Sequence, residues 1–191
     1  MGRGRVEVSP GFLLLAAWLN YADDQGVLPG ILLSCALHEL GHLAVLSLLN
    51  VPVKRIRVTT VGAEICVQVG MSYWGELLVV LAGPAVNFLL AALLCRVPGG
   101  ETLAGMNLVL GCFNLLPVGR LDGGRALKCL LALAAGPELG ELLAQLFSCL
   151  AVFVLCAAGW CLLQLGGNMT LLLVSVWLMA TMLNNGVKRQ K

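Results

Sequence analysis

The sequence predicts an all-α polytopic membrane protein with about six transmembrane helices and a small membrane-associated β-hairpin or sheet between the second and third helices. Of its 191 residues, 59% are hydrophobic and only 12% are charged, whereas soluble domains contain about 25% charged residues. So few charged side chains cannot cover a surface that faces water. The apolar residues also gather in long segments, which is typical of a chain that crosses the bilayer several times.

A membrane-spanning helix needs about 20 apolar residues, and six segments are candidates. They cover residues 8–22, 27–49, 73–95, 102–118, 141–165 and 168–184. The first segment is short, and an interfacial location is an alternative for it. A further stretch at 121–136 begins with polar residues and continues as an apolar helix that is too short to span.

The basic residues predict the orientation of these segments, because Lys and Arg favour cytoplasmic loops. If the N-terminus is cytoplasmic and all six segments span, 11 of the 12 Lys and Arg residues lie inside, and only Arg96 lies outside. The reverse orientation would place the same 11 outside. We therefore expect a multi-pass protein of the cell membrane with both termini in the cytoplasm.

Residues 51–70 do not have a helical pattern. β-branched residues are dense there, Ile65, Val67 and Val69 alternate with polar neighbours, and Gly62 can supply a turn, which indicates a β-hairpin or small sheet. An open sheet edge is not tolerated in hydrocarbon unless protein covers it or it lines a wet cavity. This element is therefore expected at the cytoplasmic rim or beside an active-site cavity.

The most informative motif is His38-Glu39-Leu40-Gly41-His42, which lies within the second apolar segment. On a helix, residues four apart share one face, so the two imidazoles can bind one metal ion with Glu39 beside them. This is the HExxH pattern of zinc peptidases, with the glutamate as general base. Ionisable residues inside a span are costly and indicate function, so the motif predicts a metal site within the membrane.

A catalytic zinc ion takes three protein ligands and keeps a fourth position open. The chain has no third histidine, so the remaining ligand must be Asp, Glu or Cys at a similar depth. Asp122 is the best candidate, because Pro117 and Gly119 end the fourth segment and can turn the chain back toward a polar cavity. A solvated Asp-Gly turn is the alternative. The eight cysteines form no CxxC pair and are interpreted as packing residues.

Three motifs in order resemble the site-2 protease family of intramembrane zinc metalloproteases. They are the HExxH, then Ala82-Gly83-Pro84 with Asn87, then 114–117 (NLLP) followed by 121–124 (LDGG). The small size and early HExxH are similar to the sporulation-type branch of that family. That branch usually carries a C-terminal CBS domain, which this sequence does not contain, so regulation through one is not expected.

The resemblance implies a single integral-membrane metalloprotease domain over 1–191, with a catalytic core of about 27–130. His38, His42 and Asp122 would bind one Zn²⁺, and Glu39 would be the catalytic base. Asn114 would lie near the metal and contact the substrate or the oxyanion, and Asn87 would line the same cavity. For both asparagines, helix–helix hydrogen bonding in lipid is an alternative role.

The implied activity is hydrolysis of a peptide bond in a membrane-tethered protein near the cytoplasmic face, as in regulated intramembrane proteolysis. The expected partners are that substrate, a regulatory membrane protein and the lipid bilayer. No basic cluster with interleaved aromatic residues indicates nucleic acid. The competing hypothesis is a membrane zinc transporter or sensor, although the polar residues of the last two segments are scattered and do not outline a path.

Overall fold

The structure is a computed structural model that describes residues 5–24, 26–59, 62–68, 70–119 and 121–189. Of the basic residues used to predict the orientation, Arg3, Arg120 and Lys191 lie outside the described residues. Two compact units make up the chain, an N-terminal unit of residues 1–113 and a C-terminal unit of residues 114–191.

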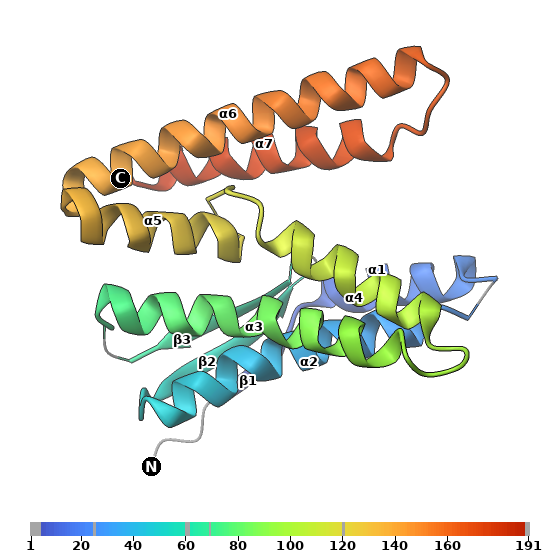
Figure 1. Cartoon of the computed structure of the whole chain (residues 1–191), viewed down its shortest axis with the longest axis horizontal. Coiled ribbons are helices and arrows are strands. Elements are labelled where there is room, and N and C mark those ends of the chain that lie inside the picture. Colours follow the sequence, from blue (N-terminus) through green and yellow to red (C-terminus); the bar gives the residue numbers. More distant parts are fainter. Residues whose placement is uncertain (1–4, 25, 60–61, 69, 120, 190–191) are drawn as a thin grey trace. The chain divides into compact units, whose positions relative to one another are not determined.

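The N-terminal unit contains four helices and three strands within its described residues (Figure 1). The strands are β1 (Arg5–Val8), β2 (Val53–Thr59) and β3 (Gly62–Val67). The helices are α1 (Pro10–Ala22), α2 (Leu28–Leu48), α3 (Tyr73–Leu94) and α4 (Glu101–Asn114), whose last residue opens the C-terminal unit. Ser9 caps α1 and Ser72 caps α3, each through its side-chain oxygen.

The sheet has the strand order β1-β2-β3, with β1 parallel to β2 and β2 antiparallel to β3. The predicted hairpin is therefore confirmed, with a φ of +127° at Gly62. Strand β1 was not predicted, because four residues are too few to give a pattern and their partner lies in β2. The register aligns Glu7, Arg57 and Glu64 across the three strands, which gives the sheet a charged row.

The C-terminal unit contains α5 (Asp122–Ala135), α6 (Pro137–Gln164) and α7 (Thr170–Arg189). Helix α5 is the short helix predicted over 121–136, and an ion pair of 2.5 Å joins Lys128 on α5 to Glu141 on α6. Helices α6 and α7 form a hairpin that turns at Gly166, where φ is +78° (Figure 1). Val118, Val152 and Leu178 form a buried hydrophobic cluster in this unit.

Three described helices, α2, α3 and α6, are long and apolar enough to cross a membrane. The prediction of several spans is confirmed in this coarser form, but the count of six is not. Helix α1 has 13 residues and α4 has 14, and a helix of 14 residues is about 21 Å long against a hydrocarbon core of about 30 Å. Helix α4 ends at Asn114 rather than at residue 118, because Pro117 cannot continue it.

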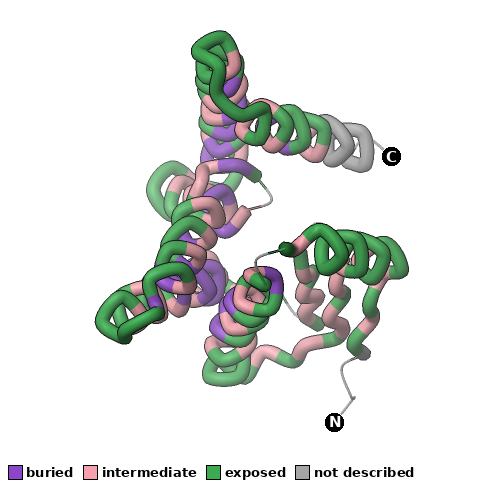
Figure 2. Tube along the Cα trace, turned by 90° about the vertical axis from the view of Figure 1, so that its right-hand side faces the viewer, coloured by how far each residue is buried: buried purple, intermediate pink, exposed green. Residues whose placement is uncertain are grey.

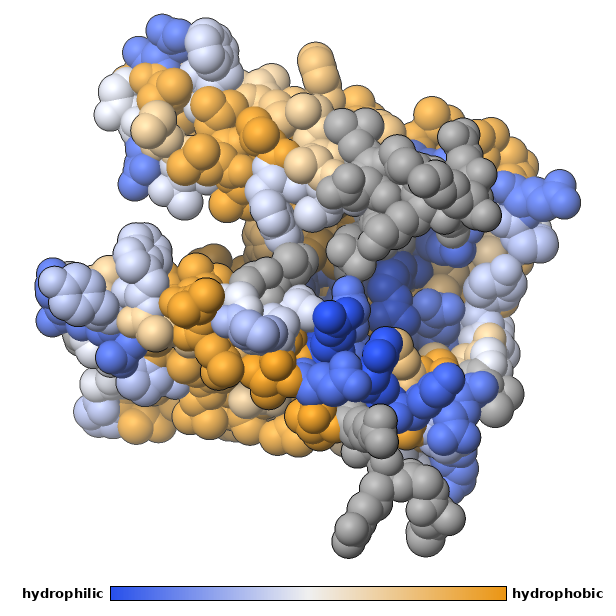
Figure 3. Space-filling view, turned by 180° about the vertical axis from the view of Figure 1, so that it is seen from behind, coloured by the Kyte–Doolittle hydropathy of each residue, from blue (hydrophilic) through white to orange (hydrophobic). Residues whose placement is uncertain are grey.

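Large apolar side chains are exposed along both units, as expected for surfaces that face lipid. Leu14 on α1 is 73% exposed and Phe153 on α6 is 70% exposed. Buried residues form only short stretches of the helices (Figure 2). Hydrophobic side chains cover long parts of the face drawn in Figure 3, and hydrophilic ones lie in several groups, the largest near the centre and toward the right of the view.

Helices α2 and α3 approach each other closely because glycines lie at the contact. A Cβ atom on Gly41 of α2 would lie 2.8 Å from the Ala82 carbonyl oxygen and 2.9 Å from a methyl carbon of Val86 on α3. A backbone oxygen cannot move away alone, so a side chain at position 41 would push the helices apart. Such glycine contacts are typical of helix pairs in membranes.

We predict that Gly41→Ala lowers the free energy of unfolding by about 1–3 kcal/mol, the usual cost of overpacking, although alanine is the better helix former. Gly105→Ala on α4 is the matched control, since a Cβ there meets nothing within 4 Å. The control is expected to raise the free energy of unfolding by up to about 1 kcal/mol. Unfolding of both variants in detergent micelles tests this, and equal stability of the two variants would contradict the packing argument.

Candidate metal centre

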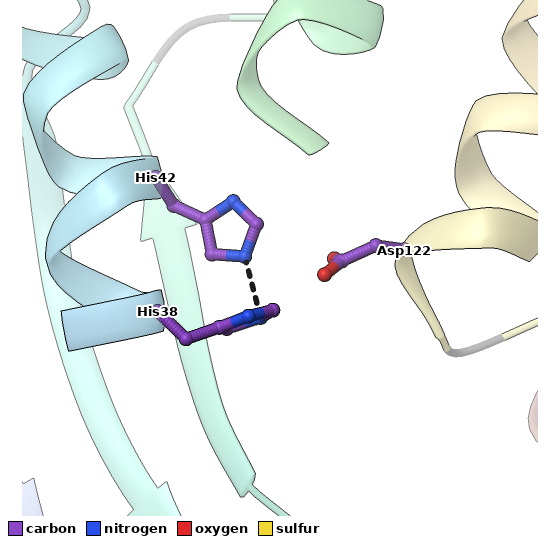
Figure 4. Close-up of side chains that lie close together, drawn as sticks. All are labelled: His38, His42 and Asp122. Carbon is purple, nitrogen blue, oxygen red and sulfur yellow. Dashed lines mark hydrogen bonds between the residues drawn. The ribbon is translucent and has the colours of Figure 1, made fainter. Parts of the chain in front are cut away.

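Helix α2 places the imidazoles of His38 and His42 on one face, one turn apart (Figure 4). Both side chains are buried. Their rings meet edge to face, with centroids 4.8 Å apart and an interplanar angle of 85°. The two Nε2 atoms lie 3.1 Å from each other. Glu39, half-buried, follows His38 on the same turn, about 100° further around the helix.

The outer ring nitrogens are both held by α3. Nδ1 of His42 lies 2.7 Å from the Val79 carbonyl oxygen, and Nδ1 of His38 lies 2.5 Å from Oδ1 of Asn87. A carbonyl oxygen only accepts, so Nδ1 of His42 must carry the proton, and the same holds for His38 opposite the amide oxygen. In each neutral ring the remaining nitrogen, Nε2, then has a lone pair and no proton.

Two lone pairs that face each other at 3.1 Å repel unless a cation lies between them. A tetrahedral zinc ion binds imidazole nitrogens at about 2.0–2.1 Å, which separates two such nitrogens by about 3.3 Å. The observed spacing of the Nε2 atoms is close to that value. The outer hydrogen bonds are also those that metal-binding histidines usually make. The histidine pair therefore fits a zinc ion.

Gly83 of α3 makes room for the imidazoles. A Cβ atom on Gly83 would lie 2.6 Å from Cε1 of His42 and 2.7 Å from Cε1 of His38, so a larger residue at position 83 would displace the rings. Pro84 lacks an N–H and so cannot donate to the carbonyl oxygen of Val80, four residues earlier. The neighbouring carbonyl oxygen, that of Val79, accepts from His42.

The other predicted ligand, Asp122, is the first residue of α5 and is buried; its side chain is also drawn in Figure 4. A carboxylate is favourable at a helix N-terminus. Gly123 and Gly124 follow it, and a Cβ on Gly123 would overlap the backbone of Leu115, with the Leu115 Cα at 2.7 Å. The glycines therefore let the chain after α4 fold directly against the start of α5. Asn114 is half-buried at the end of α4.

Asn87 is fully buried, with an exposed fraction of 0%. Besides its contact with His38, its amide nitrogen donates to Oδ1 of Asn107 on α4 at 2.9 Å. Asn87 therefore makes a hydrogen bond between helices, which was the alternative role considered for it. The same side chain also contacts His38, a candidate metal ligand.

Sequence reasoning missed Ser34 and Asn107, which lie behind Asn87 and are buried. Nδ2 of Asn107 donates to Oγ of Ser34 at 2.9 Å. Asn107 could have been identified from the sequence, since it is an asparagine inside an apolar segment. A side-chain amide in lipid needs a hydrogen-bond partner. Ser34 gave no such signal, since a serine can satisfy its hydroxyl on its own helix, as Ser34 does with the Gly30 carbonyl oxygen.

Comparisons with known proteins agree with this geometry. The chain matches a zinc metalloprotease of the archaeon Methanocaldococcus jannaschii with 34% identity over 113 residues, which cover 53% of this chain and 33% of the relative. The chain thus spans about a third of the length of that curated relative. No protein-family model matches the chain.

A solved structure, the site-2 protease from Methanocaldococcus jannaschii, has the same fold. It superimposes with a TM-score of 0.69 and 26% sequence identity, and the match covers 93% of this chain and 89% of that one. The helical fold, the small sheet and the apolar helices agree with a multi-pass membrane protein. The chain is thus similar in sequence to a zinc metalloprotease and in fold to a site-2 protease.

Proposed function

We propose that this chain is an intramembrane zinc-dependent endopeptidase that hydrolyses a peptide bond of a membrane-tethered protein near the cytoplasmic face. The observation that carries the proposal is the pair of Nε2 lone pairs 3.1 Å apart on an apolar helix. Two imidazole nitrogens at this spacing suit a shared zinc ion, and an HExxH helix supplies a base beside them.

His38, His42 and Asp122 are the proposed zinc ligands. All three are buried, and each offers one ligand atom of a type that zinc accepts. Two histidines and one carboxylate form a catalytic set, which leaves a fourth position for water or substrate. A zinc ion bound there would act as a Lewis acid and activate water for attack on a carbonyl.

Glu39 is the proposed catalytic base. It accepts the proton of the attacking water and then delivers it to the amine that leaves, so one carboxylate serves both halves of the reaction. Glu39 is half-buried on α2. Asn114 is proposed to donate from its amide to the substrate carbonyl or the oxyanion, a role that its half-buried position at the end of α4 allows.

We further propose that residues 1–191 act as a single membrane domain with a catalytic core of about 27–130. Six crossings, with both termini in the cytoplasm, would place α2 with its C-terminal end toward the cytoplasm. The short helices α1 and α4 would then need flanking residues or a locally thinned bilayer to complete their crossings. In this arrangement the substrate is tethered to the membrane, a regulatory membrane protein is a further partner, and cleavage is regulated intramembrane proteolysis.

A zinc transporter or sensor is the alternative. A transport path needs polar groups that face a cavity. The buried hydroxyls of Ser148 on α6 and Ser175 on α7 instead donate to carbonyl oxygens of their own helices, Ala144 and Leu172. These two groups therefore favour packing over transport.

We predict that Glu39→Gln abolishes peptide cleavage, by about 10²–10⁴-fold in kcat, because the amide cannot take a proton from water. Zinc content should stay at the wild-type level, since neither histidine is changed. A cleavage assay on a membrane-tethered substrate and metal analysis of the same sample measure both quantities.

The matched control for this change is Glu138→Gln, at an exposed position in the first turn of α6. It should leave both cleavage and zinc content unchanged. A Glu39→Gln protein that keeps a metal-dependent activity would favour the transporter or sensor.

We also predict that Asp122→Asn weakens zinc binding by more than about 100-fold, beyond the 10–100-fold typical of groups that only support a ligand. The change keeps the shape of the side chain and removes its charge. Asp24→Asn, at an exposed turn before α2, is the control and should bind zinc like the wild type. Competition with a chromophoric chelator gives both affinities, and equal affinities would remove Asp122 from the ligand set.

A further inference from the structure

A chain of buried polar side chains runs from His38 through α3 to α4. Asn87 and Asn107 are 0% and 1% exposed. Oδ1 of Asn87 faces Nδ1 of His38 at 2.5 Å, and Nδ2 of Asn87 donates to Oδ1 of Asn107 at 2.9 Å. In lipid, each of these groups needs a partner of the correct type, because no water can replace it.

The direction of this chain is fixed at its far end. The amide of Asn107 lies 2.9 Å from the carbonyl oxygen of Leu103 and 2.9 Å from Oγ of Ser34. The carbonyl oxygen can only accept, and the Ser34 hydroxyl already donates to the Gly30 carbonyl oxygen. Both neighbours therefore require the NH₂ group of Asn107, which turns its Oδ1 toward Asn87.

The same reasoning carries the direction to the imidazole. Since Asn107 presents an oxygen, Asn87 must present its NH₂ group, and its Oδ1 must then face His38. The Asn87 NH₂ group also lies 3.5 Å from the Ser34 carbonyl oxygen, which again only accepts. An oxygen opposite Nδ1 requires that Nδ1 carries the proton, so the lone pair of His38 is on Nε2.

We propose that Asn107 and Asn87 form a positioning relay that holds His38 in the Nδ1–H tautomer, with Nε2 ready to bind the metal. This inference rests on the proposed zinc site and deepens it. The two histidines differ in this respect: a backbone carbonyl fixes the tautomer of His42 directly, whereas His38 depends on an amide that could face either way. Asn107, at 2.9 Å, removes most of that freedom, and the longer contact of 3.5 Å with the Ser34 carbonyl oxygen acts in the same direction.

The tautomer can be measured in the metal-free protein. The chain has two histidines, so the nitrogen signals of the two rings can be told apart. In the full chain with ¹⁵N-labelled histidine, in metal-free detergent micelles at a pH where imidazoles are neutral, nitrogen shifts report which ring nitrogen carries the proton. The wild type should show Nδ1–H for both rings. Asn107→Ala should give His38 a mixture of tautomers and leave His42 unchanged as an internal control. An unchanged His38 signal in this variant would overturn the relay.

Zinc affinity gives a second and independent test. Asn107→Ala should weaken zinc binding by about tenfold, at the low end of the range for groups that support a ligand. Ser148→Ala removes another buried polar group, on α6, and should leave the affinity unchanged.

Asn87→Asp separates positioning from packing. Both carboxylate oxygens accept, so aspartate serves Nδ1–H of His38 in either orientation and needs no partner to orient it. In the single variant a carboxylate oxygen opposes Oδ1 of Asn107, and the second change removes that opposition. The double variant Asn87→Asp/Asn107→Ala should therefore bind zinc at least as tightly as Asn87→Asp alone. A further tenfold loss in the double variant would show that Asn107 acts only by holding the helices together, which overturns the relay. Wild-type protein that binds no zinc but shows the expected tautomers would instead reject the proposed zinc site.

Discussion

The two imidazoles of α2, whose Nε2 atoms lie 3.1 Å apart, constrain how α2 and α3 can pack. Their outer nitrogens must donate, so α3 has to bring an acceptor to each within hydrogen-bond distance. This requires α2 and α3 to lie closer than ordinary side chains permit. Gly41 admits the α3 backbone, and Gly83 leaves the space that the two rings occupy. The small residues of this helix pair are therefore a condition for the histidine geometry as well as for packing.

An apolar environment makes the polar groups of this unit interdependent. In water, an amide that faces the wrong way finds another partner, whereas in lipid it leaves unsatisfied groups on both sides. The orientation chosen at Leu103 and Ser34 on one side of Asn107 is thus transmitted to Asn87 and on to His38. Removing one group of the series is expected to affect the neighbours beyond the contact that is lost.

Local patterns predicted the parts of the fold that depend on neighbouring residues. The apolar run of α2, the His38–His42 spacing, the hairpin and the short helix α5 are all properties of contiguous sequence. Strand β1 depends on a partner far along the chain, so four residues gave no usable signal. The length of α4 was overestimated because an apolar run continued past the point where Pro117 ends the helix. Ser34 and Asn107 acquire their importance only when three helices pack, which periodicity cannot predict.

The two histidines differ in how readily substitution can alter them. The acceptor for His42 is the backbone carbonyl oxygen of residue 79. A substitution at position 79 therefore keeps this hydrogen bond as long as the backbone stays in place. The acceptor for His38 is a side chain, and its orientation is set by another side chain on α4. Changes at positions 87 and 107 can therefore adjust the basicity and orientation of one ligand while the other stays fixed. The metal affinity of the proposed site is then tuned from α4, a helix that contributes none of the proposed zinc ligands.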